Sequence, residues 1–450
     1  MESLTNTRSW NRIRPEHFGI IKPNLVLTVL PISISLFLYH HAAALVISSI
    51  ILASFFSKKD ISGQLRPTWP CVILPVGALI INLRPNLPNT KIEVLFFIMV
   101  LIATMRGIYT SSSKASALVS LHDGVGILIV ASVLLWLSGF GSGGSYGFGK
   151  NVITGGERIL FPLTSTLAIA PTIAAAYIVT TPMIMKATRR YRVFRVAALL
   201  AAGCILVQSD RRSALFAVAF IAIVTVAAPR TFRRLAPWVI GVVLTSPILV
   251  AVIPAAGGLS FLVSGLLTPL QRTNEDISTL NGRSNIWTRS LEFYEDRIDF
   301  LHQTFGYGTS GQVESGASSA YASMFSGLGR ERYSTSPHST VLQVLFDGGW
   351  VTAISFTVLL ICAALVMARG VSPLGLAGLS MLTAMSFVGA TENTLAPYLT
   401  AIPFWMTAVI VTVAFSREPP PPKTHENLRN KQHFNGVGAH RERQGIHEVS

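Results

Sequence analysis

The chain has 450 residues, of which 50% are hydrophobic and 13% are charged, and its formal net charge is +15. Soluble domains carry about 25% charged residues, so the composition excludes an ordinary soluble protein. Long apolar runs recur along the whole sequence, whereas the alternating runs of about ten residues that build membrane β-barrels are absent from it. The composition therefore predicts an all-α, polytopic membrane helical bundle.

The apolar runs, taken in chain order, predict about twelve transmembrane helices. A bilayer core requires roughly 17 to 25 helical residues. The predicted spans are 24–40, 42–57, 69–84, 92–110, 118–138, 160–183, 193–208, 212–228, 236–254, 338–367, 373–390 and 395–415. No small-residue cleavage site follows the first run, so we expect it to be a retained span and not a removable signal peptide.

Lysine and arginine are divided unequally between alternate loops. If the N-terminus is cytoplasmic, the cytoplasmic segments hold about 24 of these residues and the short outer loops hold about six. This bias follows the positive-inside rule and predicts that both termini are cytoplasmic. The positive net charge then reflects membrane orientation, and nucleic acid is not an expected partner.

The predicted topology divides the chain into segments with different environments. We expect a cytoplasmic N-terminal segment (1–23), helices 1 to 9 (24–254), an extracytoplasmic loop (255–337), helices 10 to 12 (338–415) and a disordered cytoplasmic tail (416–450). So long a loop between helices 9 and 10 is usually functional. A second outer segment, 138–159, is rich in glycine, which leaves open a phosphate cradle or a flexible connector.

No pattern for a metal or redox centre is present in the sequence. It contains neither a His-Glu-x-x-His motif nor an aspartate pair with the spacing of metal ligands. Cys71, Cys204 and Cys362 each lie within an apolar run, where cysteine behaves as a small buried hydrophobe. The sequence therefore predicts no cofactor, no metal and no disulfide.

The long outer loop contains a predicted amphipathic helix at 283–301. Its apolar residues fall at intervals of 4, 3, 4 and 3: Trp287, Leu291, Tyr294, Ile298 and Leu301. This spacing forms one helical face, which we expect to lie at the outer interface against lipid or the bundle. Arg283 shares that face. It either bonds to loop carbonyls at the helix start or binds a phosphate or carboxylate in a cavity.

A pair of arginines begins the predicted eighth span. Ser209 or Asp210 is the expected N-cap, and Arg211 and Arg212 then occupy the first turn. Cations at this end oppose the helix dipole, so the pair predicts a compensating anion. That anion is either Asp210 or a ligand.

His338 is predicted at the outer mouth of the tenth span. It follows Pro337, which is suited to the first turn of a helix. A histidine here is either a general base for an acceptor hydroxyl or an interfacial anchor of the helix. Glu392, at the outer entry of the last span, is expected to orient His338 or to bind substrate.

Asp347 is the other acid that follows His338 in the tenth span. Nine helical steps place it on the opposite side of the helix, so it is not an expected partner of His338 unless Gly348 and Gly349 kink the span. A carboxylate at that depth requires some other partner.

Five motifs within 205–415 resemble the O-antigen ligase and polymerase family of bacterial membrane glycosyltransferases. They are "DRRSAL", "NGRSNIW", "FGYGTSG", "SPHSTVLQVLFDGGW" and "ATENTLAPYLTAIPFW". The sequence departs from the family at Ser339, where many members have asparagine after the histidine.

The resemblance implies a metal-independent transferase on the outer face of the cytoplasmic (inner) membrane. Its donor is a glycan on a polyprenyl diphosphate carrier, usually undecaprenyl, and its acceptor is a sugar hydroxyl of a lipid core or of another lipid-linked glycan. Membrane lipids and polysaccharide-assembly proteins are further expected partners. Whether the chain is a ligase or a polymerase stays open.

The same resemblance assigns roles to individual residues. The arginines are expected to stabilise the diphosphate leaving group, and His338 to deprotonate or position the acceptor hydroxyl. The predicted catalytic residues are His338, Arg283 and Arg212, and the predicted substrate-binding residues are Arg211, Glu392, Gly308 and Trp287. Arg211 is the alternative to Arg212 in the leaving-group role.

Two other functions are compatible with the sequence. A transporter or flippase would use acids within spans, such as Asp123 and Asp347, to line a pathway, although the two halves show no internal repeat. A scaffold protein would use the basic tail from Arg417 onward to bind a partner or anionic lipid.

Overall fold

The computed structural model describes most of the helical part of the chain. The described residues are 23–37, 45, 47–49, 65, 66, 68, 70–83, 90–140, 158–164, 166–252, 283–322, 336–370 and 372–418. Several predictions lie largely outside them: the span 42–57, most of the glycine-rich segment, residues 255–282 and 323–335 of the long loop, and most of both terminal segments.

Every regular element among these residues is a helix. In the first half they are α1 (Leu25–Phe37), α3 (Pro70–Asn82), α4 (Thr90–Tyr109), α5 (Lys114–Leu137), α6 (Ile169–Ala187), α7 (Arg192–Ser209), α8 (Arg212–Ala227) and α9 (Pro229–Val252). In the second half they are α12 (Arg283–Arg297), α13 (Phe300–Phe305), α14 (Gly311–Glu314), α15 (Ala317–Ala322), α16 (Thr340–Ala368), α17 (Pro373–Thr391) and α18 (Ile402–Phe415).

Six of these helices, α5, α6, α7, α9, α16 and α17, are long and apolar enough to cross a membrane, and α1, α8 and α18 are shorter apolar helices. Each predicted span other than 42–57 has a helix at its position. The all-α class with several membrane-spanning helices is therefore confirmed, while the total of twelve and the extracytoplasmic place of the long loop stay predictions.

Two spans begin later than the sequence predicted. The α6 helix starts at Ile169 and not near 160, because Pro162 lacks an amide hydrogen and Leu163 has a left-handed backbone with φ 64°. The α18 helix starts at Ile402 and not near 395. The residues before it, 392–401, form turns around Pro397. These turns carry part of the candidate site.

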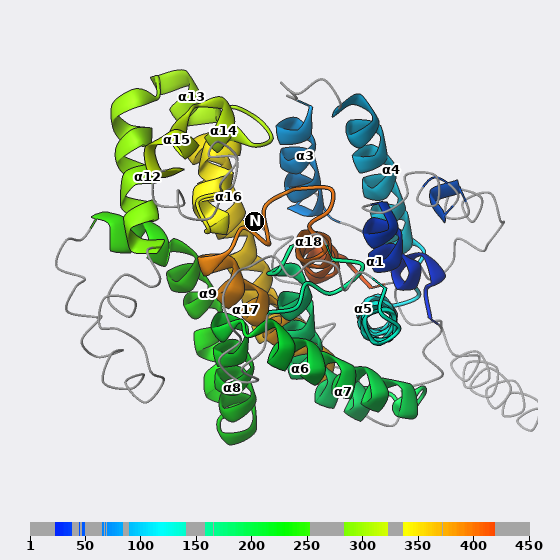
Figure 1. Cartoon of the computed structure of the whole chain (residues 1–450). Helices are drawn as coiled ribbons and strands as arrows, with labels where there is room; N and C mark the ends of the chain where they lie inside the picture. The colour runs from blue at the N-terminus through cyan, green and yellow to red at the C-terminus, as the bar shows by residue number, and fades with distance from the viewer. Residues whose placement is uncertain are drawn as a thin grey trace, which may run out of the picture.

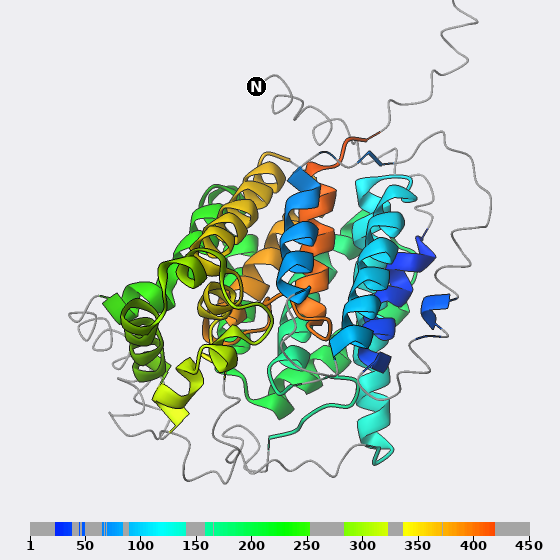
Figure 2. The ribbon, with the colours of Figure 1, turned by 90° about the horizontal axis from the view of Figure 1, so that it is seen from above.

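The α17 helix is the centre of the bundle. It packs against α6, α8, α9 and α16. Of the residues in its most apolar 18-residue stretch, 83% are buried inside the protein, against 28% for the same length of α9. Small residues permit this close packing: a Cβ added at Gly378 would approach the Met367 sulfur to 2.8 Å. The α3 and α18 helices run side by side at another part of the bundle (Figure 2).

Helix ends meet in two separate groups. In one group, Arg66 bridges to Arg417, and Lys114 Nζ donates to the Ala414 carbonyl at 3.2 Å. In the other, Asn82 Nδ2 donates to the Pro397 carbonyl at 2.7 Å, and the Thr309 amide donates to the Ile81 carbonyl at 3.2 Å. The second group joins segments that the predicted orientation assigns to the outer side.

Helices α12 to α15 gather at one end of α16 (Figure 1). The turn before α14 docks on the α16 backbone: the Tyr307 amide donates to the Phe346 carbonyl at 3.0 Å and the Gly308 amide to the Asp347 carbonyl at 2.8 Å. Gly349 has φ 68° and breaks the helical geometry of α16 there. A Cβ on Gly349 would lie 2.2 Å from the Thr304 carbonyl, so this contact requires glycine.

The predicted helix over 283–301 is two helices. The α12 helix ends at Arg297, and Asp299 then caps α13 by accepting from the Leu301 and His302 amides. Leu301 is consequently 62% exposed and leaves the apolar face that the spacing predicted. The rest of that face is buried against the protein, since α12 packs on α9, α15 and α16.

The structure has all three cysteines as free thiols. Cys71 is buried, and Cys204 and Cys362 are partly buried.

Candidate active site

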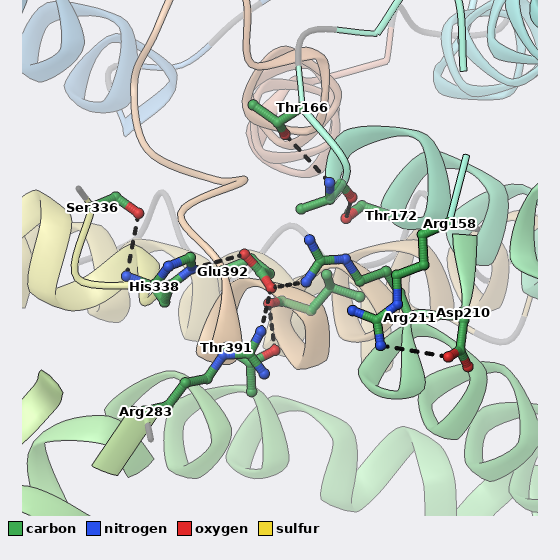
Figure 3. A network of polar contacts seen from close by, with 12 residues as sticks. Arg158, Thr166, Thr172, Asp210, Arg211, Arg283, Ser336, His338, Thr391 and Glu392 are labelled. Atoms are coloured by element: carbon green, nitrogen blue, oxygen red, sulfur yellow. Dashed lines mark hydrogen bonds and ion pairs between the residues drawn. The ribbon is translucent and has the colours of Figure 1, made fainter. Parts of the chain in front are cut away.

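Glu392, directly after α17, is the meeting point of three cationic or ionisable side chains (Figure 3). Its Oε1 accepts from Arg211 Nη1 at 2.6 Å and from Arg283 Nη2 at 2.5 Å. Its Oε2 lies 3.3 Å from His338 Nδ1. These residues come from four segments that are far apart in the sequence, so only the folded bundle assembles the cluster.

The position and charge of Glu392 are set by its neighbours. Thr340, at the start of α16, donates from Oγ1 to the Glu392 carbonyl at 2.9 Å. Burial, which leaves the Glu392 side chain 5% exposed, raises the pKa of its carboxyl, but the charges of Arg211 and Arg283 and the hydrogen bond with His338 outweigh that effect. The pKa of Glu392 is therefore lowered, and the group is a carboxylate at neutral pH.

His338 lies just before α16 begins. From Pro337, the sequence had predicted that the helix would already include it. Its backbone is left-handed, with φ 50°. Ser339 caps α16 by accepting from the Leu342 amide at 3.4 Å. Trp287 Nε1 holds the turn by donating to the Pro337 carbonyl at 3.1 Å. Serine and asparagine are both favoured N-caps, so the departure from the family at Ser339 preserves a capping residue.

Arg211 is itself the N-cap of α8, which corrects the expectation that Ser209 or Asp210 would fill that position. Asp210 ends α7 with a left-handed backbone at φ 45°. That turn gives Asp210 another partner, because its Oδ2 lies 3.5 Å from Arg158 Nη2. Arg211 can then extend to Glu392, whereas Arg212, the first helical residue, forms no bond with Glu392.

Three guanidinium nitrogens, on arginines of this site or next to it in the chain, are buried and lack a hydrogen-bond partner among the described residues. They are Arg158 Nε, Arg211 Nε and Arg212 Nη2. A buried donor left unsatisfied costs about 1–3 kcal/mol, and more when it is charged. The cluster therefore has hydrogen-bonding capacity that the described protein groups do not fill.

Arg283 lies in a region of excess positive charge. Burial lowers the pKa of its guanidinium; Glu392 raises it, and Arg211 and Arg158 lower it again. The structure pairs Arg283 with Glu392, and its binding of a phosphate or carboxylate ligand in a cavity stays a prediction. The side chain is 19% exposed, so it is accessible to an incoming group.

The other predicted site residues lie apart from Glu392. Trp287 is buried beneath the His338 turn, with 2% exposure. Gly308 lies at Asp347, about two and a half helical turns along α16 from His338. Their predicted substrate-binding roles stay predictions. The predicted catalytic role of Arg212 also stays a prediction. Arg211 is the member of the pair that shares Glu392 with Arg283 and His338.

Asp347 has the partners that its depth required, and His338 is not one of them. Its Oδ1 accepts from the Gly311 amide at 2.8 Å and from Gln343 Nε2 at 2.9 Å, and its Oδ2 accepts from the Tyr398 hydroxyl at 2.9 Å. The helical geometry is broken at Gly349, but this kink docks the outer turn and does not bring Asp347 to His338.

Three residues important for this geometry were not singled out from the sequence: Arg158, Thr340 and Tyr398. Thr340 and Tyr398 lie within motifs that were recognised, next to residues that were chosen. Arg158 had only its place at the end of the glycine-rich segment as a signal. Within the described part of the chain, no group of three or more His, Cys, Asp or Glu side chains could hold a metal; metal-free chemistry stays a prediction.

Comparison with known proteins bears directly on this cluster. Residues 196–357 match the family model described as O-antigen ligase. The match includes Arg211, Arg283 and His338, and ends before Glu392. No curated protein matches the chain.

The match and the apolar helices agree with the resemblance carried by the motifs. They indicate a multi-pass membrane protein with an activity of the ligase or polymerase type, for which the family implies glycan and lipid-linked substrates. Residues 196–357 of this chain are similar to the O-antigen ligase family.

Proposed function

We propose that the chain transfers a glycan from a polyprenyl diphosphate carrier to a sugar hydroxyl, on the outer face of the cytoplasmic membrane. The observation that carries this proposal is the convergence of Arg211, Arg283 and His338 on Glu392. Arg158 Nε and Arg211 Nε, which have no hydrogen-bond partner among the described residues, support the proposal, because phosphate oxygens are strong acceptors for arginine.

The arginines act on the leaving group. As the bond between the anomeric carbon and the diphosphate oxygen breaks, negative charge grows on the diphosphate. Arg211 and Arg283 are held in place before the reaction by Glu392, so they stabilise this charge with little reorganisation. Arg212, with a buried unsatisfied Nη2, is a further donor to the same phosphates.

His338 acts on the acceptor. Its Nδ1 faces Glu392, so the proton of the acceptor hydroxyl passes to the other ring nitrogen, Nε2. The acceptor oxygen then forms the new bond to the anomeric carbon while the diphosphate leaves, with inversion at that carbon. Glu392 orients the imidazole and stabilises the imidazolium that results.

The alternative of a transporter receives less support from the acids that suggested it. Arg195 binds both carboxylate oxygens of Asp123 at 2.8 and 2.9 Å. Asp347 accepts three hydrogen bonds from protein donors. Both carboxylates are therefore occupied by protein groups, whereas a pathway for a solute needs groups that exchange partners.

The experiment that tests the proposal replaces His338 and Arg283 with alanine in cells that depend on this chain for surface glycan. We expect loss of glycan attachment or of chain elongation, with both variants still inserted in the membrane. The control is Arg297→Ala, which removes an exposed arginine from the other end of α12. Normal glycan in the His338 and Arg283 variants would overturn the proposal.

A further inference from the structure

The short helix α13 turns its large apolar side chains away from the protein. Phe300 is 82% exposed, Leu301 is 62% exposed and Phe305 is 51% exposed. Helical spacing places these three side chains on one face of α13. Apolar surface gathered in this way marks a contact with a partner or with a membrane.

The polar side chains of α13 are bonded to protein groups on its other face. Gln303 Nε2 donates to the Tyr294 carbonyl at 3.0 Å, and the Tyr294 hydroxyl donates back to the Gln303 carbonyl. His302 stacks on Tyr307 with ring centroids 4.1 Å apart, and its Nδ1 lies 2.5 Å from Asp299 Oδ2. These contacts fix the rotation of α13 about its axis, so the apolar face cannot turn inward without breaking them.

The preceding helix, α12, has the opposite arrangement. Its apolar side chains Ile286, Leu291 and Tyr294 are buried, while the acidic side chains of Glu292 and Glu295 are exposed. This is the pattern of a helix whose outer side faces water. Two consecutive helices of one segment are therefore oriented for different surroundings, α12 for water and α13 for an apolar medium.

The contact between α13 and α16 identifies the apolar medium. A Cβ added at Gly349 of α16 would lie 2.2 Å from the Thr304 carbonyl of α13. The α16 helix is buried from Thr340 to Gly349, and its exposed apolar side chains begin at Val351. From Val351 to Ala368, where it ends, the helix rises about 27 Å, close to the roughly 30 Å of a bilayer core. The α13 helix therefore lies where the membrane-facing part of α16 begins.

We infer that α13 is a membrane-surface anchor, whose Phe300, Leu301 and Phe305 side chains insert among the lipids beside α16. Three side chains of this size expose at most about 500 Å², whereas a stable protein interface buries about 800 Å² on each partner. Figure 1 shows α13 at the edge of the bundle, where lipid reaches it. The anchor holds α12, whose first residue Arg283 contacts Glu392, at a fixed height relative to the membrane.

The test locates spin labels in the purified full-length chain, reconstituted at one copy per lipid nanodisc. The labels are attached at Leu301→Cys and, separately, at Phe305→Cys, after the native cysteines are replaced by alanine. Ile354→Cys on the exposed side of α16 is the lipid reference, and Glu292→Cys on α12 is the water reference. We expect both α13 labels to match Ile354→Cys. Their ratio of collisions with oxygen to collisions with a water-soluble nickel chelate should be several-fold above that at Glu292→Cys.

Three results would overturn the inference. Labels on α13 that meet the nickel chelate as freely as Glu292→Cys would place this helix in water. Labels shielded from both reagents would mean that another part of the chain covers the apolar face. Shielding that arises only with two copies per nanodisc would assign the face to self-association. None of these results bears on the proposed function, because the labels report where α13 lies whether or not the chain transfers glycan.

Discussion

Two clusters in this bundle contain the same chemical groups, an arginine, a carboxylate and a histidine, in different arrangements. In the first, Arg195 of α7 binds Asp123 of α5 through Nε at 2.8 Å and Nη2 at 2.9 Å, and donates from Nη1 to the Thr188 carbonyl at 3.1 Å. His122 lies 3.0 Å from the Thr181 hydroxyl and stacks on Tyr177. The second is the cluster around Glu392.

The difference lies in how completely the groups satisfy one another. Arg195 and Asp123 form a bidentate pair, and the arginine side chain is 1% exposed. Around Glu392, two arginines share one carboxylate oxygen, and their side chains are 17% and 19% exposed. Arg211 also has a buried donor, Nε, with no partner in the part of the chain that the structure describes. We call the Asp123 cluster closed, because its charged groups satisfy one another, and the Glu392 cluster open, because its arginines keep exposed surface and a donor without a protein partner among the described residues. A closed cluster fastens helices together, whereas an open one is suited to bind a further anion.

The largest effect that this comparison predicts is on stability in the closed cluster. Asp123→Asn leaves the buried charge of Arg195 without its counter-charge, which costs about 3–5 kcal/mol. We expect a large fall in the melting temperature of the purified protein and reduced amounts in the membrane. Glu392→Gln is the matched change in the open cluster, and we expect it to cost less, about 1–3 kcal/mol. Equal losses would remove the distinction between the clusters.

The next effect is on activity, and it separates the two arginines. Arg211→Ala removes a proposed donor to the leaving group, and we expect glycan transfer to fall about 10²–10³-fold while the protein stays folded. Arg195→Ala should instead reduce the amount of folded protein, with activity per folded molecule nearly unchanged. Glycan transfer, normalised to folded protein by size-exclusion chromatography, distinguishes the two. A reversed pattern would place the chemistry at Arg195.

A smaller effect is the pH dependence of stability that Glu392 contributes. Its pKa in the folded protein is held below the usual value of 4.5. The stabilisation is therefore complete above about pH 4.5 and is lost as the pH falls below that value. The difference in melting temperature between the unaltered protein and Glu392→Gln should be constant from pH 8 to 6 and shrink in acid. A gap that closes between pH 8 and 6 would contradict this sign.

Much of the fold could be predicted from the sequence, because hydrophobic length decides where membrane helices form. The predictions were wrong where short-range backbone chemistry overrides hydrophobicity. Pro162 and the left-handed Leu163 delay α6, and the turns around Pro397 delay α18. In the long loop, Asp299 ends one helix and begins another within a continuous apolar pattern, which periodicity alone does not reveal.

The candidate site was predictable in its residue types more than in its partners. Glu392 was expected to orient His338 or to bind substrate, and the structure places it 3.3 Å from the imidazole. Arg283 was chosen separately, and the structure brings it to the same carboxylate. The choice between Arg211 and Arg212 depended on where α8 begins, since one residue turns a side chain by about 100°. Arg158 could not be found, because its role comes from a contact with Asp210 across the bundle, and no local pattern records such a contact.

The smallest predicted effect concerns a third carboxylate, Asp347. It sharpens the comparison because its hydrogen-bond donors are neutral groups and not arginines. The Tyr398 hydroxyl donates to Asp347 Oδ2 at 2.9 Å, beside donors from Gly311 and Gln343. Tyr398→Phe removes one of these bonds, and we expect a loss of about 1–2 kcal/mol in the free energy of unfolding, with glycan transfer within a few-fold of normal.

Tyr307→Phe is the control for this prediction, because its ring stacks on His302 and keeps that contact in the variant. Thermal unfolding and glycan transfer are measured together for both variants. If the partners of Asp347 only stabilise the fold, as those of Asp123 do, Tyr398→Phe lowers stability and leaves glycan transfer nearly unchanged. A loss of transfer without a loss of stability would show instead that the segment 392–401 presents two carboxylate networks to the substrate, and the open region would then extend along α16 as far as Asp347.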